Sequence, residues 1–335
     1  MKRVLLVLLS VILIISLVAC KKNDFDAYIK AVNKTNEIKR GQESINYKMN
    51  IDFDTEGLTS EEIKDLKYFK NFESKFNLTF DNDLNKTIGR NYFNFGGLGF
   101  DMTFYNNGKE SFIKMPILGK YLVLDEKLMG NYLEDKDIKN EGKECISEKT
   151  IEELGQNWID TIKRDDVFAG KDSVMTTPEG EVKVTEYTIK LTGEQFKKLL
   201  TESGDILLKD KELKETIEAY VRKSVKEELD FNFNDAISNF KEAIKESKFE
   251  NLSYIAFIDI DGYIVKEKIE FNIRFTGEKH EGMNGFEYYL EMNRWDIEKE
   301  QEFKFPELTE ENTMDTDEID QGIPFMFESL FEKKE

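Results

Sequence analysis

One histidine and two cysteines are the whole supply of the softer metal ligands in this sequence of 335 residues. His280 stands alone, so a tetrahedral zinc site or a histidine-based catalytic triad lacks its residues. If Cys20 is modified, Cys145 is left without a partner, and we interpret it as an inert thiol and expect no intrachain disulfide. Stability must then come from packing. We predict no cofactor, no metal and no enzymatic activity.

Motifs that would reverse this prediction are missing or broken. No phosphate-binding loop of the GxxxxGK(S/T) type is present. Residues 81–85 resemble the start of a calcium loop, but Lys86 and Tyr92 occupy the positions of the required glycine and glutamate. With 68 acidic residues, a glycosidase-like pair of carboxylates arises by chance. An enzyme therefore remains only a third alternative.

Positive charge and proline are also scarce. The chain has 48 Lys and Arg against 68 Asp and Glu, a formal net charge of −20 at pH 7. A surface of this charge repels the phosphate backbone, which excludes nucleic acid as a partner. Four prolines are too few for a proline-rich linker protein.

The one long hydrophobic run lies at the N-terminus. Lys2 and Arg3 precede an apolar stretch over residues 4–17, and residues 17–20 have the sequence Leu-Val-Ala-Cys, which is similar to a bacterial lipobox. The stretch is shorter than the roughly 20 residues that a membrane-spanning helix needs, so a retained anchor and plain secretion are the lesser alternatives. We expect residues 1–19 to be a lipoprotein signal peptide and Cys20 to carry diacylglyceryl and palmitate-type chains. The protein would then be anchored on the extracytoplasmic side of the cell membrane.

The period of the apolar residues changes along the chain. Residues 25–32 have the spacing of an amphipathic helix, and residues 45–53 alternate strictly between apolar and polar, which predicts a strand. A charged connector with some helical character covers residues 58–68, and alternation resumes at residue 76. Turn residues such as Asn107-Gly108 then divide residues 76–124 into an up-and-down meander. Gly97 and Gly99 mark a plain turn or a bulge, two alternatives that the sequence leaves open.

A mostly helical insert is expected over about residues 126–250. Thr150 with Glu153 fits a capping box at the start of a helix, and Thr192 with Gln195 fits another. Between these helices we expect a polar loop at residues 170–180 and a strand at residues 182–191. The further expected helices cover residues 210–229 and 234–247.

Strands return after this insert. Asp261-Gly262 is a hairpin signal between residues 252–260 and 263–275, and residues 286–297 supply one more strand. We therefore predict a single domain over residues 25–305, joined to Cys20 by a tether at residues 20–24. Residues 306–335 are expected to be an acidic tail with an apolar end. That end would be a docked helix or a segment that folds on a partner, and its candidate partner-binding residues are Phe325, Phe327, Leu330 and Phe331.

This order of elements resembles the LolA/LppX-like lipoprotein superfamily. The resemblance rests on the lipobox at Cys20, on residues 45–53, and on the stretches 187–200 and 252–275. It implies an α+β fold in which a curved antiparallel sheet forms an incomplete barrel with helices packed on its concave face. Because members carry lipids or lipidated proteins in an apolar hollow, it also implies lipid binding. It offers no motif whose functional residues transfer one by one.

Two functional hypotheses follow. In the first, an apolar hollow between sheet and helices binds a lipid or another hydrophobic ligand; the same alternation is also compatible with a core that is fully packed. In the second, the protein is an interaction module that binds another envelope protein through a sheet edge or its C-terminal segment. The candidate lining of the hollow is Tyr47, Met49, Phe53, Phe93, Phe95, Phe271 and Phe275.

Overall fold

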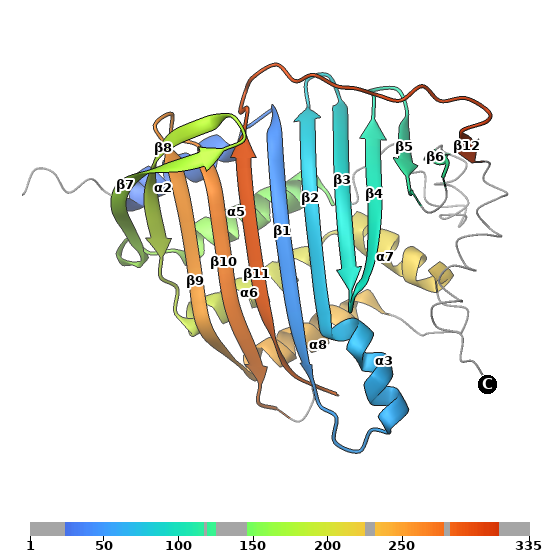
Figure 1. The fold of residues 1–335 in the computed structure, drawn as a ribbon. Coiled ribbons are helices and arrows are strands. Elements are labelled where there is room, and N and C mark those ends of the chain that lie inside the picture. The colour runs from blue at the N-terminus through green and yellow to red at the C-terminus, as the bar shows by residue number, and fades with distance from the viewer. Residues whose placement is uncertain (1–23, 117–118, 125–145, 225–231, 278–281, 315–335) are drawn as a thin grey trace, which may run out of the picture.

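The computed structural model describes residues 24–116, 119–124, 146–224, 232–277 and 282–314 (Figure 1). The first part of the chain is rich in strands. In order it holds α2 (Asp24–Asn36), β1 (Arg40–Phe53), α3 (Ser60–Lys70), β2 (Asn71–Asp81), β3 (Lys86–Phe95), β4 (Leu98–Asn106), β5 (Ser111–Lys114) and β6 (Tyr121–Val123).

The second part carries most of the helices. It holds α5 (Glu148–Thr161), the 3-10 turn η1 (Arg164–Asp166), β7 (Val167–Thr177), β8 (Gly180–Ile189), α6 (Gly193–Leu207), α7 (Lys211–Ser224), α8 (Phe233–Lys245), β9 (Ser247–Asp259), β10 (Ile264–Phe275), β11 (Met283–Trp295) and β12 (Thr313–Met314).

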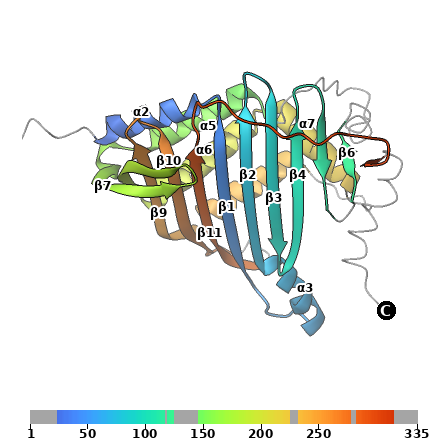
Figure 2. The ribbon, with the colours of Figure 1, turned by 45° about the horizontal axis from the view of Figure 1, so that its top comes forward.

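All twelve of these strands form one sheet, in the order β12-β6-β5-β4-β3-β2-β1-β11-β10-β9-β8-β7. Every pairing is antiparallel except that of β12 with β6. Figures 1 and 2 show α2, α5, α6, α7 and α8 on one face of this sheet, whereas α3 lies beyond one end of the strands. The predicted α+β fold, a curved antiparallel sheet with helices on its concave face, is confirmed.

The sheet is joined at its centre by strands that lie far apart in the sequence. β1 pairs with β11 from Gln42 opposite Trp295 to Ile51 opposite Phe286, and it pairs with β2 on its other side. Strands β2 to β6 follow one another as neighbours, so the predicted up-and-down meander is confirmed. The β1–β11 pairing therefore joins the N-terminal and C-terminal parts of the domain in one continuous sheet.

Several turns and caps match the sequence. Gly96 and Gly97 have φ values of 55° and 99°, which a two-residue hairpin turn requires, and Phe95 pairs directly with Leu98. The plain turn is therefore correct and the bulge is not. The capping box of α6 is confirmed, because Thr192 Oγ1 accepts a hydrogen bond from the Gln195 N–H at 3.2 Å.

The start of α5 differs from the prediction. Its N-cap is Ser147, whose Oγ accepts a hydrogen bond from the Thr150 N–H at 3.2 Å, so the proposed capping box of Thr150 with Glu153 is wrong. Ser147 is in turn held by Asp210, which accepts from the Ser147 N–H and hydroxyl at 3.0 Å each. The sequence did not indicate Ser147 as the cap because the carboxylate that supports it comes from the start of α7, far along the chain.

The polar loop expected at residues 170–180 is also wrong. Most of this segment belongs to β7, which pairs with β8 around the tight turn at Gly180. β7 is an edge strand whose residues 170–174 are exposed, so it lacks the apolar alternation that marks a half-buried strand. Here the backbone pairing, and not burial, makes the strand.

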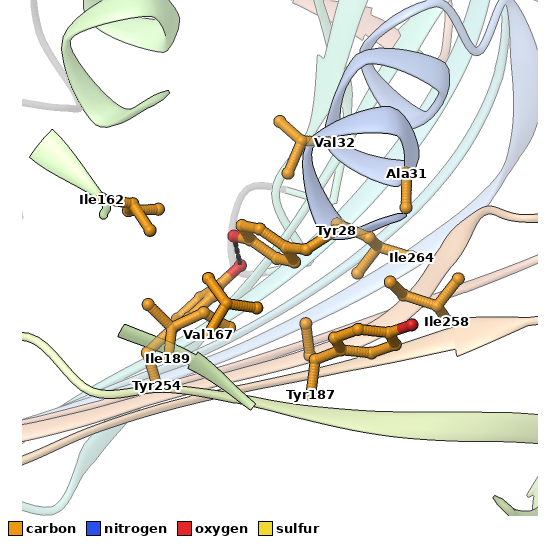
Figure 3. Close-up of a cluster of buried hydrophobic side chains, with 11 residues drawn as sticks. Tyr28, Ala31, Val32, Ile162, Val167, Tyr187, Ile189, Tyr254, Ile258 and Ile264 are labelled. Carbon is orange, nitrogen blue, oxygen red and sulfur yellow. Dashed lines mark hydrogen bonds between the residues drawn. The ribbon is translucent and has the colours of Figure 1, made fainter. Parts of the chain in front are cut away.

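The main core lies between α2, α5 and strands β7 to β10 (Figure 3). Tyr28 of α2 is fully buried and its hydroxyl donates a hydrogen bond to that of Tyr254 on β9 at 3.1 Å. Trp158 Nε1 of α5 donates to the Tyr28 hydroxyl, also at 3.1 Å. Aromatic bodies thus fill the core while their polar ends satisfy one another. The other buried members are Ala31, Val32, Ile162, Val167, Tyr187, Ile189, Ala256, Ile258 and Ile264.

A second cluster continues this core under α6. Phe196 and Leu199 of α6 pack on Phe271 of β10, and the rings of Phe196 and Phe271 are 5.1 Å apart. Half-buried side chains of β9 and β11 surround them. The core therefore reaches β10 and thins out at β11.

Residues 296–314 run across the ends of β1 to β4 and finish in β12 (Figures 1 and 2). The segment is fixed at its start, where the Glu298 N–H donates to the Arg40 carbonyl at 3.0 Å, and near its end, where the Tyr121 N–H donates to the Asn312 carbonyl at 2.7 Å. Residues 306–314, which we assigned to the tail, are thus attached to the sheet. The predicted domain limits otherwise stay predictions.

Candidate ligand-binding face

The register of the strands places mostly apolar side chains on one side of the central sheet and mostly polar side chains on the other. Ile45, Tyr47 and Met49 of β1 lie opposite Phe76, Ser74 and Phe72 of β2. Since side chains alternate between the two faces, these residues share the concave side with the helices. Neighbouring strands add apolar side chains to the same side: Phe93 and Phe95 of β3, Leu98, Phe100, Met102 and Phe104 of β4, and Phe286, Tyr288, Leu290 and Met292 of β11.

The concave sides of β1–β4 and β11, which we call the open face, are only half covered. Within the described residues, no apolar side chain of these five strands is buried, whereas β7 to β10 contribute a series of buried ones. At the end of the β3–β4 hairpin, Phe95 and Leu98 are 40 % and 39 % exposed. The apolar side chains of the open face are therefore more accessible than those of β7 to β10.

An aromatic row crosses the open face from strand to strand. Its consecutive ring centroids lie 4.8 Å apart for Phe95 and Phe72, 5.2 Å for Phe72 and Tyr47, 5.2 Å for Tyr47 and Tyr288, and 4.7 Å for Tyr288 and Phe271. These are the separations of favourable aromatic pairs. The row begins at the exposed hairpin and ends under α6, so it joins the open face to the core.

The structure brings most of the predicted lining residues together. Tyr47, Phe93 and Phe95 lie on the open face, and the Tyr47 hydroxyl donates to Met49 Sδ at 3.4 Å. Phe53 is half-buried at the end of β1. Phe271 is different, because it is buried under Phe196 and belongs to the core edge of the aromatic row. The predicted lining residue Phe275 has its ring 6.2 Å from Phe286.

Several members of this surface were not among the predicted lining residues, among them Phe72, Phe286 and Tyr288. Phe72 directly follows α3, so the alternation of β2 was recognised only from Phe76 onward. Tyr288 and Phe286 lie on a predicted strand, but only the pairing of β11 with β1 shows that they stand beside Met49 and Ile51. Their alternation with Glu287 is the signal that pointed to this side.

One end of the open face is polar. Arg294 of β11 donates to Glu267 Oε2 through NH1 at 2.6 Å and pairs with Glu43 Oε1 through Nε at 3.1 Å. Glu267 Oε1 accepts from the Tyr254 hydroxyl at 2.5 Å, which connects these charges to the core tyrosines. Burial raises the pKa of Glu43 above its ordinary value, although Arg294 opposes the change. Burial, and then Glu267, also raises the pKa of Tyr254.

A depression of about 200 Å³ lies beside these charges. Glu43, Arg294 and Phe80 line it, together with Gly41, which has no side chain to fill it. The remaining lining residues come from the α2–β1 connection and its surroundings: Thr35, Ile38, Gln42 and Ile297. The lining of the pocket therefore combines charged, polar and apolar residues.

The convex side of the same strands is charged. Glu291 lies 3.1 Å from Lys266 and 3.5 Å from Lys268. Burial alone would raise its pKa, but hydrogen bonds from Lys266, Asn293 and Tyr289 lower the pKa of Glu291 to about 2. This side is a solvated face whose charges are paired with one another.

A second depression, of about 380 Å³, includes polar residues of this convex side, among them Asn50, Asn272, Arg274 and Glu287. Its floor includes Gly285, where an added Cβ would lie 2.1 Å from the Ile273 carbonyl oxygen. The glycine is required by this close approach of two strands. Ile51, Ile273 and Phe286 also line it, so its surface is mixed polar and apolar.

The described residues show few features of catalysis. Among them, no group of three or more His, Cys, Asp or Glu side chains is placed to hold a metal ion. No described helix is long and apolar enough to cross a membrane. Cys20, Cys145 and the predicted partner-binding residues Phe325, Phe327, Leu330 and Phe331 lie outside the described residues.

Comparison with known proteins assigns no family. No protein-family model matches the chain, and no curated protein matches it. Among solved structures, the chain is similar to a LolA superfamily protein from Nitrosomonas europaea, with 7 % sequence identity, a TM-score of 0.19, and coverage of 87 % of this chain and 96 % of that one. At this TM-score the likeness carries no argument about family or function. The resemblance to the LolA/LppX-like superfamily stays a prediction, and the fold stands on the sheet and helices themselves.

Proposed function

We propose that this protein binds the hydrocarbon part of a lipid or acylated molecule against the open face and carries out no catalysis on it. The observation that carries the proposal is the aromatic row, whose members Phe95, Phe72, Tyr47 and Tyr288 lie on strands with no buried apolar side chain among the described residues. Each methylene removed from water contributes about 0.8 kcal/mol, so about ten methylenes would supply roughly 8 kcal/mol before the cost of association. The ligand that we propose therefore carries at least one long acyl chain.

The chemistry of the open face supports this class of ligand. Phe72, Phe93 and Tyr47 offer flat apolar surface, and of the two polar residues between them the Ser74 hydroxyl donates to Asn91 Oδ1 at 2.9 Å. Apolar side chains thus make up most of this surface, which suits a saturated chain.

We further propose that the protein works at a membrane surface, attached through acyl chains on Cys20. The lipobox-like tetrad at residues 17–20 supports this anchor. An anchored binding protein meets its lipid at the membrane and need not dissociate from it. Growth with an alkyne-tagged palmitate should label the full chain and leave a Cys20→Ser variant unlabelled. Equal labelling of both would contradict the anchor and leave lipid binding untouched.

Bound lipid is the direct test of the main proposal. The chain expressed without residues 1–20, which lacks the proposed anchor and is purified without detergent or polymer, should release lipid on extraction with organic solvent, and mass spectrometry should find about one chain-bearing molecule per protein. A Phe93→Glu variant places a charge on the open face and should lose this lipid.

Lys75→Glu is the matched control, since Lys75 is exposed on the opposite side of the neighbouring strand and the substitution adds more negative charge. This variant should retain the lipid. Equal loss from both variants, or a protein free of lipid that captures another envelope protein, would contradict the proposal and favour the interaction-module hypothesis.

A further inference from the structure

The charged side chains on the concave side of the central strands lie together at one end of these strands. On β1–β4, β10 and β11, the register leaves only Glu43, Glu267 and Arg294 facing the helices, because the other charged residues of these strands alternate onto the convex side. All three lie at the same end of the strands. The open face is thus apolar along its length and charged at one end.

These three side chains carry an excess of negative charge. Arg294 is shared by the two carboxylates at 2.6 and 3.1 Å, so one positive charge stands against two negative ones. Each of the three side chains is between 16 % and 19 % exposed. Water therefore screens the surplus charge less than it screens an exposed convex pair such as Lys48 and Glu73, whose side chains are 51 % and 41 % exposed.

The 200 Å³ depression lies directly beside this surplus charge. Glu43 and Arg294 line it, Glu267 reaches it only through its ion pair with Arg294, and Phe80 continues the apolar concave side of β2 into it. The volume of roughly seven water molecules fits a small head such as a glycerol or an ammonium group. The pocket is therefore a distinct compartment at the end of a surface suited to a chain.

We propose that this pocket receives the polar head of the bound amphiphile and selects a head that donates hydrogen bonds and carries no negative charge, an ammonium or a hydroxylated group. This inference rests on the proposed function, since it assigns the head of the same ligand. A carboxylate or phosphate head would be placed against the surplus negative charge, which costs binding energy. The raised pKa of Glu43 agrees with a carboxylate that gains from a donor beside it.

Three probes with the same twelve-carbon chain separate head from chain: dodecylamine, 1-monododecanoylglycerol and dodecanoate. Each probe is titrated at pH 7 into the full chain with N-phenyl-1-naphthylamine bound, and the loss of fluorescence measures the displacement. The concentration of the probe is kept below the value at which that probe forms micelles. The amine and the glyceride should each bind at least about 10-fold more tightly than dodecanoate, because like charges are placed together only in the last case.

Glu43→Gln keeps the size of the side chain and should reduce the preference for amine over dodecanoate to within about 3-fold, with little change for the glyceride. Glu73→Gln is the control, because Glu73 lies on the convex side, where it is paired with Lys48 at 3.2 Å. This substitution removes the same charge from the protein as Glu43→Gln does. It should leave all ratios unchanged. If Glu43→Gln fails to fold, the wild-type comparison is repeated at high salt, which screens the overall charge of the protein; the preference should persist, and its loss would overturn the head selection.

The outcomes distinguish the two proposals. Equal affinity for the three probes, or tightest binding of dodecanoate, overturns the head selection and leaves the chain-binding function in place. An equal change of the ratios in Glu43→Gln and Glu73→Gln also overturns it, because the effect would then belong to the overall charge. Displacement by none of the probes overturns the proposed function itself.

Discussion

The two halves of the sheet use the same sequence pattern for different purposes. Strands β8 to β10 and strands β1 to β4 all alternate apolar and polar residues, yet Tyr254, Ala256 and Ile264 are buried under α2 and α5, whereas Tyr47 and Phe93 are only half covered. Alternation therefore identifies the apolar side of a strand and says nothing about what covers it. Burial requires a helix whose apolar side chains pack on the strand, and helices α2, α5 and α6 bury apolar side chains only as far as β10.

The polar content of the two halves differs in the same way. Under the helices, the Trp158 indole donates to the Tyr28 hydroxyl, which donates to the Tyr254 hydroxyl, and Tyr254 donates in turn to Glu267. On the concave side of the open face, the charged side chains stand only at one end. The core therefore holds a chain of linked polar groups, and that chain leads out to the charges beside the open face.

The largest expected difference between the halves is the loss of stability when one isoleucine is replaced by alanine. Ile264→Ala opens a cavity in the core and should lower the free energy of unfolding by about 3 kcal/mol, whereas Ile45→Ala on the open face should cost about 1 kcal/mol. Urea denaturation of both variants measures the difference. Equal costs would mean that the open face is as tightly packed as the core and would break the comparison.

The helical cover should depend on Asp210, which joins α5 to α7. Burial alone would raise its pKa, but hydrogen bonds from Leu213, Ser147 and Thr150 lower the pKa of Asp210 from its ordinary 3.8 to about 2. Because the folded value is the lower one, its contribution of about 2 kcal/mol is complete above pH 4 and is lost as the pH falls through 2.

Asp210→Asn should therefore be less stable than the wild type by about 2 kcal/mol at pH 7, and the two should converge near pH 2. Chemical denaturation across this range tests the prediction. A stability difference that does not vary with pH would show that the carboxylate charge is not what holds the two helices.

A smaller effect is expected at the start of α6, the helix that covers Phe271. Thr192→Ala removes the N-cap hydroxyl and should cost about 1 kcal/mol. Thr192→Ser keeps the hydroxyl and should restore most of it. If the two variants lose equally, the cap contributes through packing of the threonine methyl instead of the hydrogen bond.

Much of the fold could be predicted from local patterns. The strict alternation of residues 45–53 gave β1, the glycines of the Gly96-Gly97 turn gave a hairpin, and Thr192 gave the start of α6. Each of these signals acts between residues close in the sequence. The failures are of the opposite kind: Ser147 was missed as a cap because its support comes from Asp210, and β7 was missed because an edge strand needs pairing and no apolar alternation.

The same limit applied to the candidate site. Tyr47, Phe93 and Phe95 could be named because they alternate in predicted strands, but Phe271 could not be assigned to the core before α6 was placed over it. The charges of Glu43 and Arg294 could not be connected at all, since only the β1–β11 pairing brings them together. Selectivity therefore lay beyond the sequence, although the apolar character did not.

Photolabelling with a long-chain alcohol that carries a diazirine within its chain tests the difference between the two halves most directly. After irradiation of the full chain and proteolysis, the label should appear on peptides of β1 to β4, and competition with 1-monododecanoylglycerol should remove it. Label concentrated on β8 to β10, or label that the competitor does not remove, would contradict the assignment of the open face as the binding surface.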